Sequence, residues 1–113
     1  MTFLTDEQRI RMLANGAARA KDREIDPYPV VKLYTLDARA SWLLTDLKAD
    51  GDQAYGLIDA GTGFPELGQV SLSALAGVRG PAGLRIVVDP RFEPRRPLSA
   101  YAADAQRDGS IND

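Results

Sequence analysis

Three short runs of β-branched, aromatic and leucine residues follow one another with only short polar loops between them. They cover Val30 to Tyr34, Trp42 to Leu47 and Ala54 to Ala60. Residues of these types favour a pleated backbone, and loops this short cannot hold the crossover that parallel strands need. Asp50-Gly51, between the second and third runs, suits a tight turn. The runs therefore predict an antiparallel meander.

Amphipathic helices are predicted at both ends of the chain. Thr5 and Gln8 have the spacing of a capping box, and an apolar i, i+3, i+4, i+7 stripe follows as far as about Ala20. Gly16 inside this stripe costs about 1 kcal/mol relative to alanine, and after Asn15 it also suits a C-cap. A second stripe follows Pro97, which fits a first helical position. We expect both helices to pack on one face of the sheet.

The remaining sequence completes a single domain. Gln69-Val70 and Leu84 to Val88 predict two further strands, and Ser71 between them can cap a short helix. A chain of 113 residues with 44% apolar residues has the size and composition of one folded core. We expect residues 1–113 to form one α+β domain, built mainly on an antiparallel sheet of about five short strands.

Composition excludes several kinds of chemistry. The chain has no cysteine and no histidine, which removes thiol nucleophiles, the usual zinc ligands and the commonest general base. We assign no catalytic residue, no metal site and no cofactor from the sequence. The first six residues show no targeting pattern, and no run approaches the ~20 apolar residues of a membrane span. A cytoplasmic protein with no membrane partner is expected.

The segment from Gly61 to Gly68 follows a predicted strand and looks at first like a phosphate-binding loop. It does not fit, because Glu66 stands where a third glycine is needed and Pro65 lacks an N–H. We expect a tight turn with positive φ at glycines. An alternative is that Asp59 and Glu66 converge on Mg²⁺. As a surface, this segment supplies the candidate binding residues Asp59, Gly61, Gly63, Phe64, Pro65 and Glu66.

A second acidic pattern is Asp37 followed by Asp46-Leu47-Lys48. Metal-dependent nucleases place two carboxylates and a lysine on adjoining strands, where the carboxylates hold the ion and the lysine helps to position water. Lys48 stands where the strand should already be turning, so charged hairpin residues are the simpler interpretation.

A third candidate surface is cationic. Between Arg79 and Arg96 five arginines stand against two carboxylates, a local charge of +3 in a chain whose net charge is −2. Arg91, Arg95 and Arg96 alternate with Phe92 and Tyr101, which is the material for stacking on single-stranded nucleic acid. The same residues suit an anchor whose aromatics dock on the core while the arginines stay in water. Direct nucleic-acid binding is thus less favoured than a protein partner.

The chain resembles a small bacterial family known as domain of unknown function family 2958, over nearly its whole length. Its most distinctive run is Gly-x-Gly-Phe-Pro-Glu-Leu-Gly, here Gly61 to Gly68. Further matching stretches are Leu4 to Arg9, Leu13 to Gly16, Asp26-Pro27, Pro29 to Leu33, Trp42 to Thr45, Tyr55 to Asp59, Val70 to Leu72 and Pro97 to Tyr101. The resemblance implies no activity and no catalytic residue. Members of this family look typical of plasmids and integrative elements, near antirestriction and DNA-transfer genes.

These observations favour a non-enzymatic binding or accessory protein of a bacterial mobile element, which recognises a protein or nucleoprotein partner in anti-defence or DNA transfer. One alternative is a carboxylate- and Mg²⁺-dependent nuclease or phosphoesterase using Asp37, Asp46, Lys48, Asp59 and Glu66. Another is a structural subunit that completes a larger complex. The oligomeric state is open.

Overall fold

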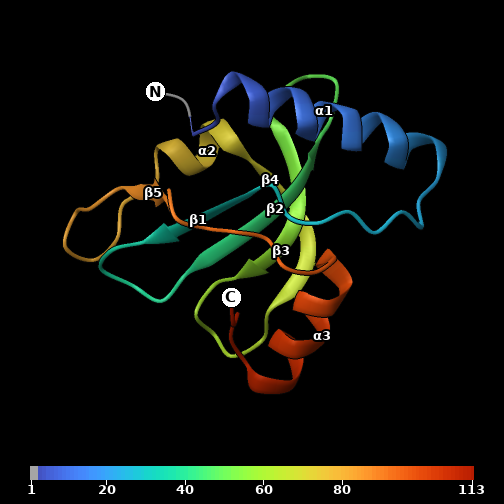
Figure 1. Ribbon diagram of the computed structural model, residues 1–113. Helices are drawn as coiled ribbons and strands as arrows, with labels where there is room; N and C mark the ends of the chain where they lie inside the picture. Colours follow the sequence, from blue (N-terminus) through green and yellow to red (C-terminus); the bar gives the residue numbers. More distant parts are fainter. Residues whose placement is uncertain (1–2) are drawn as a thin grey trace.

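A computed structural model describes residues 3–113. The first two residues, which belong to the predicted domain and to the N-terminal stretch without a targeting pattern, lie outside the described residues. The elements run in the order α1 (Asp6–Lys21), β1 (Val31–Thr35), β2 (Ser41–Leu47), β3 (Gln53–Asp59), β4 (Glu66–Ser71), α2 (Leu72–Ala76), β5 (Ile86–Val88) and α3 (Leu98–Asp108) (Figure 1). The α+β class is confirmed.

The strands form one antiparallel sheet in the order β4-β3-β2-β1-β5. The predicted meander is confirmed, and it continues through β4. β5 joins the opposite edge, where Leu33 pairs with Val88. The second hairpin turns at Asp50-Gly51 as predicted. There Gly51 has a φ of 73°, and the Asp50 carboxylate accepts from the backbone N–H groups of Asp52 and Gln53.

The two terminal helices lie on opposite faces of the sheet, so the expectation that both pack on one face was wrong (Figure 1). On β2, Leu44 belongs to the cluster under α1 and α2, whereas its neighbour Leu43 packs with Tyr101 and Ala105 of α3. Successive side chains of a strand point to opposite faces. Because β2 is apolar at consecutive positions, both of its faces need a cover, and each terminal helix supplies one.

Helix α1 begins as predicted, because Thr5 and Gln8 form a complete capping box. It continues through Gly16, so Asn15-Gly16 is not a C-cap. At Gly16 the helix crosses β2 backbone to backbone. An ideal Cβ at this position would stand 1.7 Å from the carbonyl oxygen of Leu47, which only glycine avoids.

Asn15 secures the same crossing at a β-bulge. The register of β2 against β3 shifts between Leu44 and Asp46, which leaves Thr45 without a cross-strand partner. The side-chain amide of Asn15 donates to the backbone carbonyl of Thr45 at 2.8 Å. The helix thus satisfies a buried acceptor at the irregular point of the sheet.

Other predicted ends are confirmed, apart from the position of Pro97. Ser71 caps α2 by accepting from the N–H of Ala74, and the carboxylate of Asp52 accepts from Ser73 N–H and the Ser71 hydroxyl. These hydrogen bonds lower the pKa of Asp52 below its usual value. Gly109 ends α3 with a φ of 81°, as predicted, whereas Pro97 is not the first helical residue: its ψ of 158° is extended, and it is the N-cap directly before Leu98. Among the described residues, no helix has the length and apolar character needed to span a membrane.

Replacing Gly16 with alanine tests the crossing. In an exposed helix this change stabilises by up to about 1 kcal/mol. Here the added methyl group meets the Leu47 carbonyl, so we expect G16A to lower the free energy of unfolding by about 3 kcal/mol. Urea unfolding followed by the fluorescence of Trp42 measures it.

Gly77→Ala is the matched control. Gly77 has a φ of −90°, and a Cβ there meets only the Ala74 carbonyl at 3.6 Å. We expect its stability to stay within about 1 kcal/mol of wild type. If G16A were as stable as G77A, the close crossing would be incorrect.

Candidate functional site

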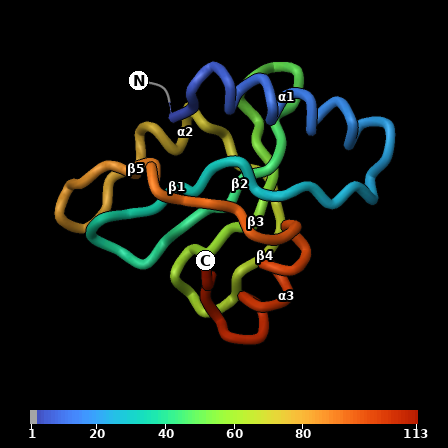
Figure 2. Tube along the Cα trace, viewed as in Figure 1, coloured from blue at the N-terminus to red at the C-terminus, as the bar shows by residue number. Residues whose placement is uncertain are grey.

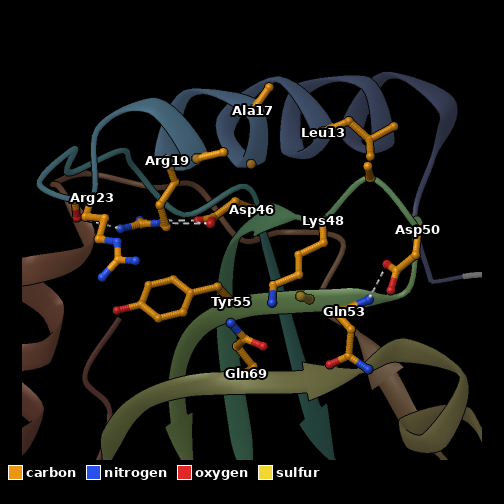
Figure 3. Close-up of a pocket in the computed structure, with 14 residues that line it drawn as sticks. Leu13, Ala17, Arg19, Arg23, Asp46, Lys48, Asp50, Gln53, Tyr55 and Gln69 are labelled. Carbon is orange, nitrogen blue, oxygen red and sulfur yellow. Dashed lines mark hydrogen bonds and ion pairs between the residues drawn. The ribbon is translucent and has the colours of Figure 1, made fainter.

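A groove of about 870 Å³ lies between α1 and the β2–β3 hairpin and extends across β3 to Gln69 on β4 (Figure 3). One wall is the surface of α1 from Leu13 to Ala20 together with Arg23, which follows the end of the helix, and the opposite wall is the hairpin. Its lining residues are Leu13, Gly16, Ala17, Arg19, Ala20, Arg23, Asp46, Lys48, Ala49, Asp50, Gln53, Ala54, Tyr55 and Gln69. It combines an apolar helix surface with several long polar side chains.

A bidentate ion pair joins the two walls. Nε and Nη2 of Arg19 donate to the two carboxylate oxygens of Asp46, at 2.7 and 3.3 Å. The Asp46 side chain is only 6% exposed and also accepts from the hydroxyl of Thr45. The guanidinium carbon lies 4.4 Å from the centre of the Tyr55 ring, which pairs with Asp46 across the sheet (Figure 3). Arg19 is therefore held by a charge and by an aromatic face.

Two further cations line the groove without neutralisation. Among residues 3–113, neither Arg23 nor Lys48 has a carboxylate within ion-pair distance. Asp50, the second acid of the lining, is occupied by the backbone N–H groups of the hairpin, which lower its pKa. The groove thus carries three cations against two carboxylates, and both carboxylates already have partners.

The predicted glycine-turn residues lie at the other end of β3, outside this groove. Gly61 and Gly63 have φ values of 79° and 87°, as expected for the turn. Asp59 is 4% exposed, and its carboxylate accepts from Gly61 N–H at 2.8 Å and Ile111 N–H at 3.2 Å. It therefore fastens the C-terminal tail beside the turn (Figure 2). Phe64 is 81% exposed, Glu66 is exposed and Pro65 is buried.

Asp59 and Glu66 do not face each other. Glu66 pairs with Ile58, which packs in the cluster under α1, whereas Asp59 bonds the tail that follows α3. Adjacent residues of a strand point to opposite faces, so the two carboxylates diverge. They offer no joint Mg²⁺ site.

The acidic pattern of the nuclease alternative is also dispersed. Asp37 accepts from the backbone N–H groups of Ala82 and Leu84 in the loop before β5. Asp46 is bound to Arg19 at the far end of β2, beside Lys48. Within residues 3–113 there is no group of three or more carboxylates that could hold a metal ion.

The predicted cationic surface is mixed in charge. Arg91 and Arg95 line a hollow of about 270 Å³ together with three carboxylates, those of Asp89, Glu93 and Asp113. Arg96 lies over the ring of Tyr101, 4.8 Å from its centre, and the Tyr101 hydroxyl accepts from the N–H of Arg95. Phe92 and Tyr101 thus pack in the cluster on the α3 face, as the alternative of an anchor with its aromatics docked on the core predicts.

Comparison with known families identifies the chain. The model of the family described as "Protein of unknown function (DUF2958)" matches residues 3–112, nearly the whole sequence. The chain belongs to this family. The search of the curated proteins found no match, and neither did the search of the solved structures. For this DUF2958 protein, functional inference therefore rests on its own geometry.

The groove residues of this DUF2958 protein that sequence reasoning missed are Arg19, Arg23, Tyr55 and Gln69. One signal was available, because Asp46 is the only charged residue in the apolar run from Trp42 to Leu47. A carboxylate in a buried strand requires a cation, and the last turn of α1 presents Arg19, with Arg23 just after the helix. The sequence cannot say that α1 crosses β2 at this end.

The buried ion pair predicts a specific loss of stability. Asp46→Ala leaves the guanidinium of Arg19 with no counter-charge and removes its bidentate acceptor, so we expect the free energy of unfolding to fall by about 3 kcal/mol. Arg11→Ala is the control, because Arg11 pairs with Glu7 in solvent. That change should cost about 0.5 kcal/mol or less. Equal losses in urea unfolding would contradict the structural role of the Arg19–Asp46 pair.

Proposed function

We propose that this DUF2958 protein is a non-enzymatic binding protein that recognises acidic residues of a partner protein in the groove between α1 and the β2–β3 hairpin. The observation that carries the proposal is the pair of cations, Arg23 and Lys48, which line a partly apolar groove without a carboxylate partner among the described residues. An anion entering the groove meets two cations that form no ion pair among residues 3–113, and the Asp50 carboxylate attracts Lys48 only from beyond ion-pair distance.

The Arg19–Asp46 pair strengthens the preference of the groove for an anion. It fixes the wall of the groove and leaves Asp46 unable to repel an incoming carboxylate, because Arg19 already compensates its charge. Gln53 and Gln69 add amide groups that can donate hydrogen bonds to a ligand. Charge and hydrogen-bond donors together favour a carboxylate-bearing segment.

A protein partner suits this groove better than nucleic acid. A nucleic-acid interface commonly neutralises about six to ten phosphates, and the groove offers two free cations in a chain of net charge −2. Tyr55 is the aromatic residue of the lining, and Arg19 covers one face of its ring. Stacking on a base therefore has little room.

The biological setting extends the same proposal. The family resemblance supports an accessory protein of a bacterial plasmid or integrative element, acting in the cytoplasm on a host or element protein in anti-defence or DNA transfer. The dispersed carboxylates give the nuclease or phosphoesterase alternative no comparable support. The alternative of a structural subunit stays a prediction; the exposed large apolar side chains that could serve it are Ile10, Tyr28, Leu36, Phe64, Leu67, Val78 and Leu84.

Peptide selection tests the proposal without a known partner. A displayed library of random linear peptides is selected on the wild-type protein and counter-selected on the Arg23→Glu/Lys48→Glu double variant. We expect acidic peptides whose affinity falls about tenfold or more in either single variant, as for the loss of a close charge pair.

Lys21→Glu is the matched control, since Lys21 is an exposed cation at the end of α1 outside the groove. It carries the same change of charge and should alter affinity less than about threefold. A failure to select any peptide that depends on Arg23 or Lys48 would refute the proposal. Tighter groove binding of a single-stranded oligonucleotide, measured in parallel, would replace the protein partner with nucleic acid.

A further inference from the structure

The β4 strand is an open edge of the sheet. It pairs with β3 on one side, and its other side has no neighbouring strand. The N–H of Leu72 donates to the carbonyl of Asp52, which fixes the phase of the β3–β4 ladder. In an antiparallel pair the backbone groups of alternate residues point to the partner. Val70 and Gly68 therefore face β3, whereas the N–H and C=O groups of Leu67 and Gln69 and the N–H of Ser71 point outward; the C=O of Ser71, the N-cap of α2, belongs to the helix.

After its first residue, the exposed Glu66, this edge lacks the devices that normally block strand addition. Natural edges are kept short or carry lysine, proline or a bulge. β4 has six residues, Glu66–Ser71, with no lysine, arginine or proline and an unbroken register to β3. The opposite edge, β5, has only three residues. Of the two edges of the described sheet, β4 is the one open to a partner.

Both ends of the β4 edge offer side-chain contacts on the same face of the sheet. Leu67 and Gln69 pair with Leu57 and Tyr55 across β3, so they lie on the face that α3 covers. At the first end Leu67 is 41% exposed, next to the exposed Phe64. Towards the other end, Gln69 is part of the groove wall, and Lys48, just after β2, lies across β3 from this part of β4 (Figure 3).

We propose that β4 accepts an extended segment of the partner protein as an additional antiparallel or parallel strand. The segment carries an apolar residue beside Leu67 and acidic residues at the end nearest Lys48. This inference rests on the proposed function, because the groove selects the acidic end. The N–H and C=O groups of Leu67 and Gln69, with the N–H of Ser71, supply the ladder hydrogen bonds, and the side chains set the orientation.

A second copy of this chain fits the edge less well. Two β4 strands related by a two-fold axis perpendicular to the sheet keep the same faces on the same side. The acidic side chain of β4, Glu66, shares its face with Ile58, opposite to the face of Gln69. Self-pairing would therefore bring no β4 carboxylate to the cations of the groove.

Proline at Gln69 isolates the backbone contribution. The Gln69 N–H points outward, so Gln69→Pro should fold, since edge strands tolerate proline there. It removes the central outward donor and places a ring in the path of the added strand. Gln69→Ala is the matched control, because it removes the side chain and keeps the N–H. Val70→Pro removes an N–H that faces β3 and should unfold the chain.

The peptides selected on the groove serve as probes. Because the Gln69 amide also lines the groove, Gln69→Ala is the reference for loss of the side chain, and we expect Gln69→Pro to weaken binding about tenfold or more beyond the loss that Gln69→Ala causes. In the complex, the amides of Leu67, Gln69 and Ser71 should exchange with solvent more slowly than in the free protein.

The outcomes separate this inference from the proposed function. Peptides that depend on Lys48 but bind Gln69→Pro as tightly as wild type would overturn strand addition and leave the groove in place. If Gln69→Pro did not fold while Gln69→Ala did, the outward direction of this N–H would be wrong and the inference with it. Dimerisation of the wild-type protein that Gln69→Pro abolishes, seen by sedimentation, would overturn the partner segment in favour of a second copy.

Discussion

The close contact between Gly16 of α1 and the Leu47 carbonyl of β2 determines how the rest of the molecule is arranged. A side chain at this position would push the helix away from the sheet. With glycine, the helix reaches the strand backbone, so Asn15 can bind the Thr45 carbonyl and Arg19 can reach Asp46. Three residues within two turns of one helix thus contact three consecutive residues of one strand. The groove exists because this crossing fixes α1 over the end of the β2–β3 hairpin.

Helix α1 stabilises both the bulge at Thr45 and the buried carboxylate of Asp46 that follows it. A bulge leaves a strand residue unpaired, and here a helix amide takes its carbonyl. Asp46 is nearly buried, which is tolerable because Arg19 supplies both charge and paired donors. Asp37 and Asp59 act in a similar way, since each accepts from backbone N–H groups of a distant segment. Three of the four acidic residues that suggest catalysis in the sequence, Asp37, Asp46 and Asp59, thus hold a loop, a helix and the C-terminal tail in place.

The sequence predicts well the caps and turns that depend on interactions between residues a few positions apart. The capping box at Thr5, the turn at Asp50-Gly51 and the Ser71 cap all follow from side chains that bond their own neighbours. It cannot predict which face a helix covers, because an apolar stripe specifies burial and not a partner. Gly16 illustrates the limit. From its neighbours in sequence, Gly16 is expected only to lower the stability of the helix. The position of the Leu47 carbonyl, distant in sequence, shows that the glycine is required.

Where a partner can bind follows from the same packing. Consecutive apolar residues of β2 demand a cover on each face, so α1 and α2 take one side and α3 takes the other. A sheet covered on both faces exposes unpaired backbone only at its edges. At the β5 edge the strand is short, and Asp37 ties down the loop that precedes it. β4 has a longer free edge that leads from the exposed Phe64 to the cations of the groove. Burial of β2 on both faces therefore leaves this edge, with the groove beside it, as the place where the proposed partner can add a strand.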